Sequence, residues 1–294
     1  MKARTLSPLV SLPRKFKPRR SQSRVNWWVY LITLVLSVIF LFPLFWMATT
    51  SLKSMEQAYA FPPVWFPHPV MWENYVRIFT ELPFFTFTIN SIVITALNTI
   101  GVTFTSALVA FGFARLRARG RDFLFIVLIS TIMLPYQVIL VPTFILFKYL
   151  KWINTILPLV VPAYFGGGAF NIFLLRQFFM TIPFEYDEAA IMDGAGWFTI
   201  FWKIMLPLSK PALTTVAVLN LVAVWTDFFG PLIYLNDLGK MTLAVGLAFL
   251  PGQHSAVLTL LMAGSMFTTV PMLILFFLAQ RYFVEGIQLT GLKG

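Results

Sequence analysis

The sequence predicts an all-α membrane protein with six transmembrane helices, and three observations support this fold class. Of its 294 residues, 59% are hydrophobic and 11% are charged, whereas a soluble domain carries about 25% charged residues. Six apolar runs are long enough to cross a bilayer, which takes about 20 residues of helix. Lysine and arginine are unevenly distributed between these runs, as is typical of membrane proteins.

The first apolar run, residues 27–50, follows a basic arm, residues 1–26, that holds eight lysines and arginines. A secretory signal has an apolar region of only about 7–15 residues, so this run is predicted to stay as the first span. The other five runs are 85–113, 123–147, 155–178, 212–235 and 257–283. We therefore expect a transmembrane domain over residues 27–284 and a short cytoplasmic tail over 285–294.

The positive charges predict the orientation of the spans. With the N-terminus inside, the cytoplasmic segments carry 17 of the 22 lysines and arginines, and the outer segments carry five. Because positively charged loops stay in the cytoplasm, both termini are expected inside, which is an N-in/C-in topology. The segment 181–211, between the fourth and fifth spans, is then cytoplasmic. The loop 51–83 is outside, where its aromatic residues suit either lipid headgroups or a partner protein.

The composition also excludes several chemistries. There is no cysteine, and the two histidines, His68 and His254, are far apart, so we expect no metal site. The net charge of +11 follows the membrane topology, so lipid is expected as a partner and nucleic acid is not. A phosphate-binding P-loop needs Ser or Thr after Gly-Lys, but Gly239-Lys240 precedes Met241. The chain is therefore not expected to hydrolyse ATP itself, and a partner or an ion gradient must supply the energy.

Residues 181–211 read as an ordered helical hairpin in a chain that is otherwise mostly apolar. Thr181 can cap a first helix and Pro183 suits its first turn. Gly194 and Gly196 offer the left-handed turn that ends this helix. Acidic residues at the helix start favour its positive dipole end, and these are Glu185, Asp187 and Glu188. The apolar stripe of the second helix is predicted to be Trp197, Ile200, Phe201 and Ile204.

This hairpin resembles a sequence found in the permease subunits of ABC importers. Glu188-Ala-Ala-Ile-Met-Asp-Gly194, followed by Ile204-Met-Leu-Pro207, is similar in composition and spacing to the EAA loop of that family. Further matches are Asn90-Ser91, 133–137, 169–179 and 231–236. The resemblance is to the carbohydrate-uptake, maltose-type (MalG-like) branch, and it extends from about residue 27 to the C-terminus.

The resemblance implies a non-catalytic permease subunit of an ATP-driven, binding-protein-dependent sugar importer that works by alternating access in a prokaryotic plasma (inner) membrane. The implied partners are a second homologous permease subunit, a dimer of ATP-binding subunits, an extracytoplasmic solute-binding protein and a sugar-class solute. This chain would hold no cofactor, and ATP and Mg would bind the partner ATPase. The EAA loop would contain the coupling helix.

The resemblance also assigns roles to residues of the hairpin. Those expected to dock the ATPase are Glu188, Ala189, Ala190, Asp193, Gly194, Ile204, Leu206 and Pro207. The small side chains of Ala189 and Ala190 would allow close approach, and Gly194 would set the turn. Ile204, Leu206 and Pro207 would seat the second helix of the hairpin against the spans.

Polar groups inside the spans indicate where a solute could pass, since such groups usually face a cavity or another helix. Asn220 and Asp227 are two helical turns apart and would share one face, and Trp225 offers a ring for the C–H face of a sugar. The predicted solute-path residues are Asn90, Gln137, Asn220, Trp225 and Asp227. A purely structural hydrogen bond is the alternative for these residues.

A stand-alone ion-coupled secondary transporter is the alternative function. Such transporters are built from repeated halves with broken helices and polar sites in matching positions. Asp227 is the one plausible carboxylate within the predicted spans, and the first half of the sequence contains no matching partner. The importer subunit is therefore the favoured hypothesis.

Overall fold

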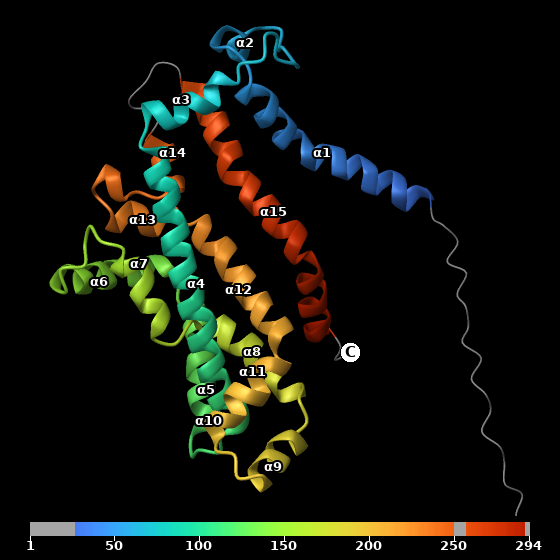
Figure 1. Ribbon diagram of the computed structural model, residues 1–294, viewed down its shortest axis with the longest axis vertical. Coiled ribbons are helices and arrows are strands. Elements are labelled where there is room, and N and C mark those ends of the chain that lie inside the picture. Colours follow the sequence, from blue (N-terminus) through green and yellow to red (C-terminus); the bar gives the residue numbers. More distant parts are fainter. Residues whose placement is uncertain (1–26, 250–256, 292–294) are drawn as a thin grey trace, which may run out of the picture. The chain divides into compact units, whose positions relative to one another are not determined.

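The computed structural model describes residues 27–249 and 257–291, and side chains as far as residue 280 (Figure 1). Every regular element in these ranges is helical, which confirms the all-α class. The chain divides into two compact units, residues 1–45 and 46–294. The basic arm predicted for residues 1–26 lies outside the described part of the chain.

The first predicted span is confirmed as a single helix, α1 (Trp27–Ser51). Its side chains from Trp27 to Pro43 are all exposed. Only its last residues, Thr49, Thr50 and Ser51, are buried. The helix is long and apolar enough to cross a bilayer, so most of its surface is suited to contact with lipid or another membrane helix.

The second unit is built around α4 (Phe84–Arg115), which has 32 residues and is about 48 Å long at 1.5 Å per residue. Helices α8 (Ala169–Thr181) and α12 (Lys210–Trp225) share a buried cluster with it. The members contributed by α4 include Ala107, Ala110 and Ala114. Small residues let membrane helices approach closely, so this part of α4 is the tightly packed centre.

The predicted third span is sharply bent. It consists of α5 (Arg121–Ser130) with the short helix η1 (Thr131–Met133), followed by α6 (Tyr136–Tyr149). The two parts meet at 98°. The bend lies at Pro135, whose missing N–H cannot continue the hydrogen-bond ladder and whose ring disfavours helical geometry at the residue before it.

The fifth predicted span also departs from a straight helix. Just before the predicted span 212–235, the segment from α10 (Trp197–Ile200) to α11 (Leu206–Leu208) meets α12 at 78°. Helix α12 then ends at Trp225, and a separate short helix, α13 (Phe229–Tyr234), follows. The described residues thus contain four helices able to cross a membrane, or up to six if each bent pair is one span.

The fourth predicted span is interrupted by three glycines. The short helices α7 (Leu157–Val160) and η2 (Val161–Tyr164) lead into residues 166–168, whose φ angles are 117°, 66° and 90°. A Cβ atom on Gly167 would lie 2.0 Å from Ser106 Oγ and 2.6 Å from the carbonyl oxygen of Val102. This position therefore needs glycine both for its backbone conformation and for its close approach to α4.

The remaining elements gather mostly around the start of α4. They include α2 (Met55–Tyr59), α3 (Glu73–Glu81), η4 (Leu238–Lys240) and α14 (Leu243–Phe249). A second buried cluster joins α3, α14 and the start of α4 to α15 (Val257–Gly291). Figure 1 shows α3 and α14 near one end of α4, and α9 and α10 near the other. Because α15 is helical to Gly291, most of the predicted tail, 285–294, continues this helix.

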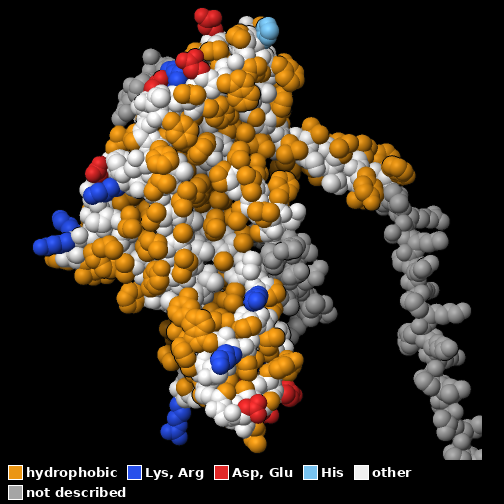
Figure 2. All heavy atoms as spheres, in the orientation of Figure 1, with side chains coloured by type: hydrophobic (Ala, Val, Ile, Leu, Met, Phe, Trp, Pro, Cys, Tyr) orange, Lys and Arg blue, Asp and Glu red, His pale blue; other side chains and the backbone are white. Residues whose placement is uncertain are grey.

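Hydrophobic side chains cover most of the face drawn in Figure 2. Contiguous exposed apolar patches on soluble proteins rarely exceed a few hundred Å². A surface this apolar is therefore not typical of a protein in water. Large exposed hydrophobic side chains occur on α4, α5 and α6, and they include Ile100, Phe123 and Val138. The exposed apolar surface is therefore suited to a lipid environment.

Candidate functional site

The hairpin between α8 and α12 begins with α9 (Glu185–Met192), which has Glu185, Asp187 and Glu188 in its first turn. The predicted cap at Thr181 is wrong. Thr181 ends α8, and its hydroxyl donates to the carbonyl of Phe178 at 2.7 Å. Phe184 stands at the N-cap position of α9 and makes no side-chain cap. Pro183 therefore precedes α9. The acidic residues of the first turn are left to stabilise the positive end of the helix dipole.

The C-terminal end of α9 closes as expected at Gly194. This residue has φ of 82°, a left-handed conformation that glycine adopts without a Cβ penalty. Its N–H donates to Ile191, and the N–H of Ala195 donates to Ala190, both at 2.9 Å. These two bonds form the Schellman motif, which satisfies carbonyls at a helix end. Gly196, with φ of −79°, is extended and takes no part in the left-handed turn.

The second helix of the hairpin buries part of the predicted stripe, because Ile200 and Phe201 are buried whereas Trp197 is exposed. Ile200, Phe201 and Met205 are at most 1% exposed, whereas Ile204 is only half-buried. Residues 201–205 form a π-helix, in which each turn holds an extra residue. The π-helix places Met205, four residues on, and not Ile204, three residues on, in the buried position after Phe201, whereas an α-helical pattern allows either spacing.

Packing of this second helix joins the hairpin to the spans. The ring of Phe201 lies 5.3 Å from the ring of Phe111 on α4, centre to centre. Ile204 and Leu206 pack half-buried against the same cluster as α4 and α8. Pro207 is exposed, so the seating expected of it falls instead to Phe201 and Met205.

A buried ion pair holds the start of α9 against the end of α4. Arg115 Nε and Asp187 Oδ2 lie 3.1 Å apart, and the two side chains are 0% and 2% exposed. Arg115 Nη2 donates to the carbonyl of Ile182 at 2.7 Å, and the guanidinium lies 4.3 Å from the ring centre of Phe184. One arginine thus contacts three residues of the segment that leads into α9.

The carboxylate of Asp187 depends almost entirely on Arg115. Neither of its oxygens accepts a hydrogen bond from the residues that the structure describes. Burial raises the pKa of Asp187 above its ordinary value, the Arg115 charge opposes this rise and Glu188 adds to it. From the sequence, Arg115 was expected only to contribute to the topology. Its position at the very end of an apolar run was the one signal that could have indicated a buried ion pair.

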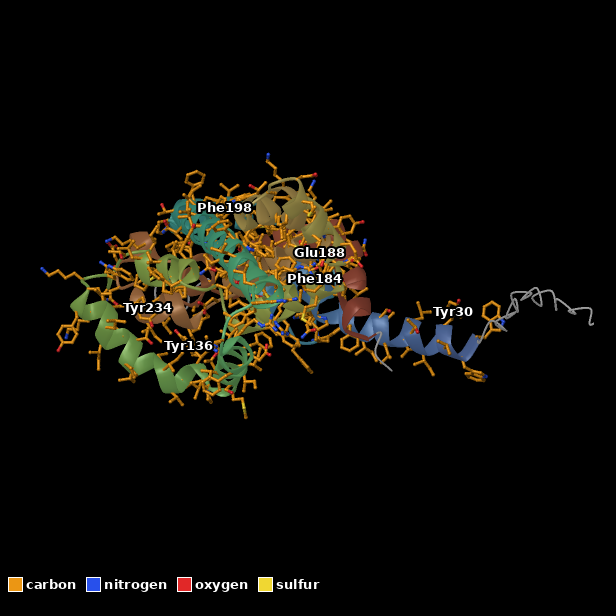
Figure 3. All side chains as sticks on the ribbon, turned by 90° about the horizontal axis from the view of Figure 1, so that it is seen from below. Tyr30, Tyr136, Phe184, Glu188, Phe198 and Tyr234 are labelled. Atoms are coloured by element: carbon orange, nitrogen blue, oxygen red, sulfur yellow. The ribbon has the colours of Figure 1, made fainter. Side chains whose placement is uncertain are left out.

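The outward face of α9 combines acidic and apolar side chains. Tyr186 is 53% exposed and Met192 is 86% exposed. Glu188, Ala189, Asp193 and Gly194 are exposed as well, whereas Ala190 is buried under the helix. Figure 3 labels Phe184, Glu188 and Phe198, all from this end of the molecule. Of the predicted docking residues on α9 and its turn, all but Ala190 are therefore open to a partner.

Three of the predicted solute-path residues make structural hydrogen bonds instead of lining one cavity. Asn90 Nδ2 donates to the carbonyls of Gly239 and Met241 at 3.1 and 3.0 Å. Asn220 Nδ2 donates to Asn98 Oδ1 at 3.0 Å, which ties α12 to α4. Trp225 Nε1 donates to the carbonyl of Thr268 at 3.2 Å, which ties α12 to α15. Such interhelical bonds are the alternative that the sequence had left open.

The predicted shared helix face of Asn220 and Asp227 is wrong, because α12 ends at Trp225. Asp227 Oδ1 accepts the N–H of Gly230 at 3.2 Å, at the start of α13. Asp227 also borders a small cavity of about 50 Å³ and a larger one of about 500 Å³. The larger cavity includes Tyr136 and Tyr234, which are labelled in Figure 3. Gln137 is exposed on α6 and lines neither of these two cavities.

Comparison with known proteins identifies the family. A family model described as the binding-protein-dependent transport system inner membrane component matches residues 103–288. The chain belongs to this family. The matched region contains the α9–α11 hairpin and most of the packed helices, and it begins within α4.

Several curated relatives match over most of their length. The chain is 32% identical over 286 residues to the probable ABC transporter permease protein YurM of Bacillus subtilis, covering 95% of this chain and 93% of YurM. It is 34% identical over 229 residues to the arabinooligosaccharides transport system permease protein AraQ of Halalkalibacterium halodurans, covering 78% and 81%. It is 32% identical over 267 residues to the trehalose/maltose transport system permease protein MalG of Thermococcus litoralis, covering 89% and 94%.

Two solved structures share the fold. One is a bacterial ABC transporter involved in the import of the acidic polysaccharide alginate, with a TM-score of 0.79 at 24% identity, covering 91% of this chain and all of the matched chain. The other is a bacterial alginate ABC transporter in complex with an alginate pentasaccharide-bound periplasmic protein, with a TM-score of 0.63 at 16% identity, covering 86% and 92%.

The family assignment confirms that this chain is an ABC transporter permease of the inner membrane and not an enzyme. It supports the importer hypothesis, and it does not support the stand-alone ion-coupled transporter. The EAA loop was the decisive signal in the sequence, and it lies within the matched region.

Proposed function

We propose that this chain is one of two permease subunits of a sugar-class ABC importer, and that its α9 hairpin docks a cytoplasmic ATPase. The observation that carries this proposal is the construction of α9. Its outward face is acidic and apolar, whereas its inward face is fixed by the buried pair Arg115–Asp187. A short helix that offers such a face suits a groove on a partner.

The proposed N-in/C-in orientation is supported by the charges at the two ends of α4. The hairpin contacts the end of α4 through Arg115, so it lies on the same side as the arginine-rich turn, residues 115–121. Loops enriched in arginine and lysine stay in the cytoplasm. The start of α4, near η4 and α14, would then face the outside and the binding protein.

Coupling by this route requires the hairpin and the spans to move together. ATP and Mg would bind the partner dimer, and closure of that dimer would draw the coupling helices of two permease subunits together. In this chain the movement would reach α4 through Arg115 and through the contact of Phe201 with Phe111. Because packed interiors are stiff, the displacement would turn the spans between inward-open and outward-open states.

A sugar-class solute is supported by the printed names of the relatives, which transport arabinooligosaccharides or trehalose and maltose. Among the predicted solute-path residues, Asp227 keeps the strongest position, because it borders two cavities. The larger cavity offers Tyr136, Phe147 and Tyr234 as aromatic walls. Aromatic rings with a polar end suit a ligand that is apolar on one face and hydroxylated on another.

The docking proposal is tested by the double variant Glu188→Lys with Gly194→Pro. Reversing an exposed charge and removing the left-handed turn should abolish co-purification of the ATPase and lower solute uptake more than about tenfold, since 1.4 kcal/mol of lost binding is a factor of ten. Glu56→Lys, the same charge change on exposed α2, is the matched control and should leave both unchanged. Undiminished uptake with intact ATPase co-purification would defeat the proposal.

A further inference from the structure

The turn between α4 and α5 forms a basic pocket that the transport mechanism does not use. The pocket has a volume of about 740 Å³ and is lined by Arg117, Arg119, Arg121, Phe123 and Phe184, among others. This volume is within the range of about 300–1,000 Å³ that is usual for ligand sites. Phe184, labelled in Figure 3, connects the pocket to the start of α9.

The charges in this pocket are not balanced by protein. Asp122 is its one acidic residue, and it is engaged by Arg121, with Nε and Oδ1 3.1 Å apart. Arg121 also donates from Nη1 to the carbonyl of Leu116 at 3.3 Å. Arg117 and Arg119 are exposed, and neither forms an ion pair with a residue in the described part of the chain. The pocket therefore offers two free guanidinium groups, which favour an anionic, bidentate ligand such as a phosphate group.

An apolar helix face begins where this basic pocket ends. No residue of α5 is buried, and Phe123, Leu124 and Ile126 are 66%, 55% and 64% exposed. The helix has 10 residues, about 15 Å at 1.5 Å per residue, which is half of a hydrocarbon core about 30 Å thick. The 98° bend after η1 then turns the chain away. The exposed face of α5 is therefore as long as one leaflet.

We propose that this pocket binds the headgroup of an anionic phospholipid, whose acyl chains lie along the exposed face of α5. Arg117 and Arg119 would contact the phosphate, and Phe123 would lie at the boundary between headgroup and chain. Basic pockets near the cytoplasmic surface are suited to anionic lipid headgroups. The lipid would also contact Phe184, whose ring lies under the guanidinium of Arg115. It would therefore stabilise the segment that leads into α9.

Native mass spectrometry of the intact transporter from nanodiscs tests this proposal with phosphatidylglycerol as the probe and phosphatidylcholine as the neutral comparison. The double variant Arg117→Gln with Arg119→Gln should retain phosphatidylglycerol about 25-fold more weakly, roughly a factor of five for each arginine. The matched control is Lys148→Gln with Lys151→Gln, which removes two exposed charges elsewhere. Equal losses in both variants, or equal retention of the two lipids, would overturn the proposal.

A second measurement works even if the double variant fails to fold. The sequence contains no cysteine, so Ala118→Cys in the pocket and Tyr149→Cys on exposed α6 each give a single labelling site. Phosphatidylglycerol should slow maleimide labelling at position 118 several-fold and leave position 149 unchanged. Inorganic phosphate distinguishes the source of the ligand. Protection by phosphate as strong as that by the lipid would overturn a lipid site in favour of a free-phosphate site.

Discussion

The two ends of α4 are fastened to the rest of the protein by different chemistry. At its start, Asn90 donates to two backbone carbonyls, and Ser91 Oγ accepts the N–H of Leu243 at 2.8 Å. At its end, Arg115 faces Asp187 in a buried ion pair. Neutral hydrogen-bonding groups have a small desolvation penalty, and each such bond contributes about 1 kcal/mol to stability. A buried ion pair adds little net stability, but it is costly to break by removing one partner.

The start of α4 is thus held by several independent hydrogen bonds, whereas its end is held mainly by the contacts of one arginine. Further neutral bonds near the start include Asn154 Oδ1, which accepts the N–H groups of Asn236 and Asp237. The loss of any one of these bonds leaves the others in place. At the hairpin end, a single guanidinium contacts Ile182, Phe184 and Asp187. The end proposed to receive force is therefore expected to respond to single substitutions far more strongly than the other end.

The largest expected effect is that of Asp187→Ala. Removing this carboxylate leaves Arg115 charged and buried, which should lower the free energy of unfolding by about 3–5 kcal/mol. Chemical denaturation of the transporter in mixed micelles measures this change. The exposed pair Arg121–Asp122 provides the control, and Asp122→Ala should cost less than about 1 kcal/mol.

Replacing both members of the buried pair sharpens this prediction. Arg115→Met combined with Asp187→Leu removes both charges and keeps apolar volume, so the double variant should be more stable than Asp187→Ala alone. If the double variant is less stable than Asp187→Ala, the ion pair is not the contact that determines stability at this end.

Asn90→Ala should have an intermediate effect at the start of α4. It removes two neutral hydrogen bonds and leaves the carbonyls of Gly239 and Met241 without these donors. The expected loss is about 1–2 kcal/mol in the same denaturation experiment. A loss as large as that of Asp187→Ala would contradict the contrast between the two ends.

Gly194→Ala, compared with Gly196→Ala, should have the smallest effect. A Cβ atom would meet no atom within 4 Å at either position, but only Gly194 has a positive φ. The left-handed conformation costs a non-glycine residue roughly 1–2 kcal/mol, so Gly194→Ala should be destabilising by about 1 kcal/mol more than Gly196→Ala. Equal stabilities would show that the end of α9 relaxes without its Schellman turn.

Hydropathy predicted the straight spans well and the bent ones poorly. The run 27–50 became α1 (Trp27–Ser51), and 85–113 became α4 (Phe84–Arg115). Both are apolar helices without internal turns, so length and composition were sufficient. The bend at Pro135 was missed because an average over an apolar run hides a single helix-breaking residue. The six-span count holds only if each bent pair is one span.

At the hairpin, the helix end at Gly194 and the acidic first turn were predicted correctly, whereas the cap at Thr181 and the tertiary contacts were not. Gly194 and the acidic first turn of α9 depend on backbone geometry and helix dipole, which nearby residues determine. The partner of Asp187 is on α4, and the partners of Asn90 and Asn220 are on other elements. Contacts between residues far apart in sequence cannot be derived from the spacing of one chain without an alignment.

The π-turn at residues 201–205 has a consequence for insertions and deletions. One extra residue in a helix rotates everything beyond it by about 100°, since a turn takes 3.6 residues. Shortening this segment by one position would bring Leu206 to the place that Met205 occupies and would rotate the entry to α12 around the helix axis. Among relatives, a gap at this point should be compensated by a second length change before α12, because the length of this segment determines the direction in which the chain enters α12.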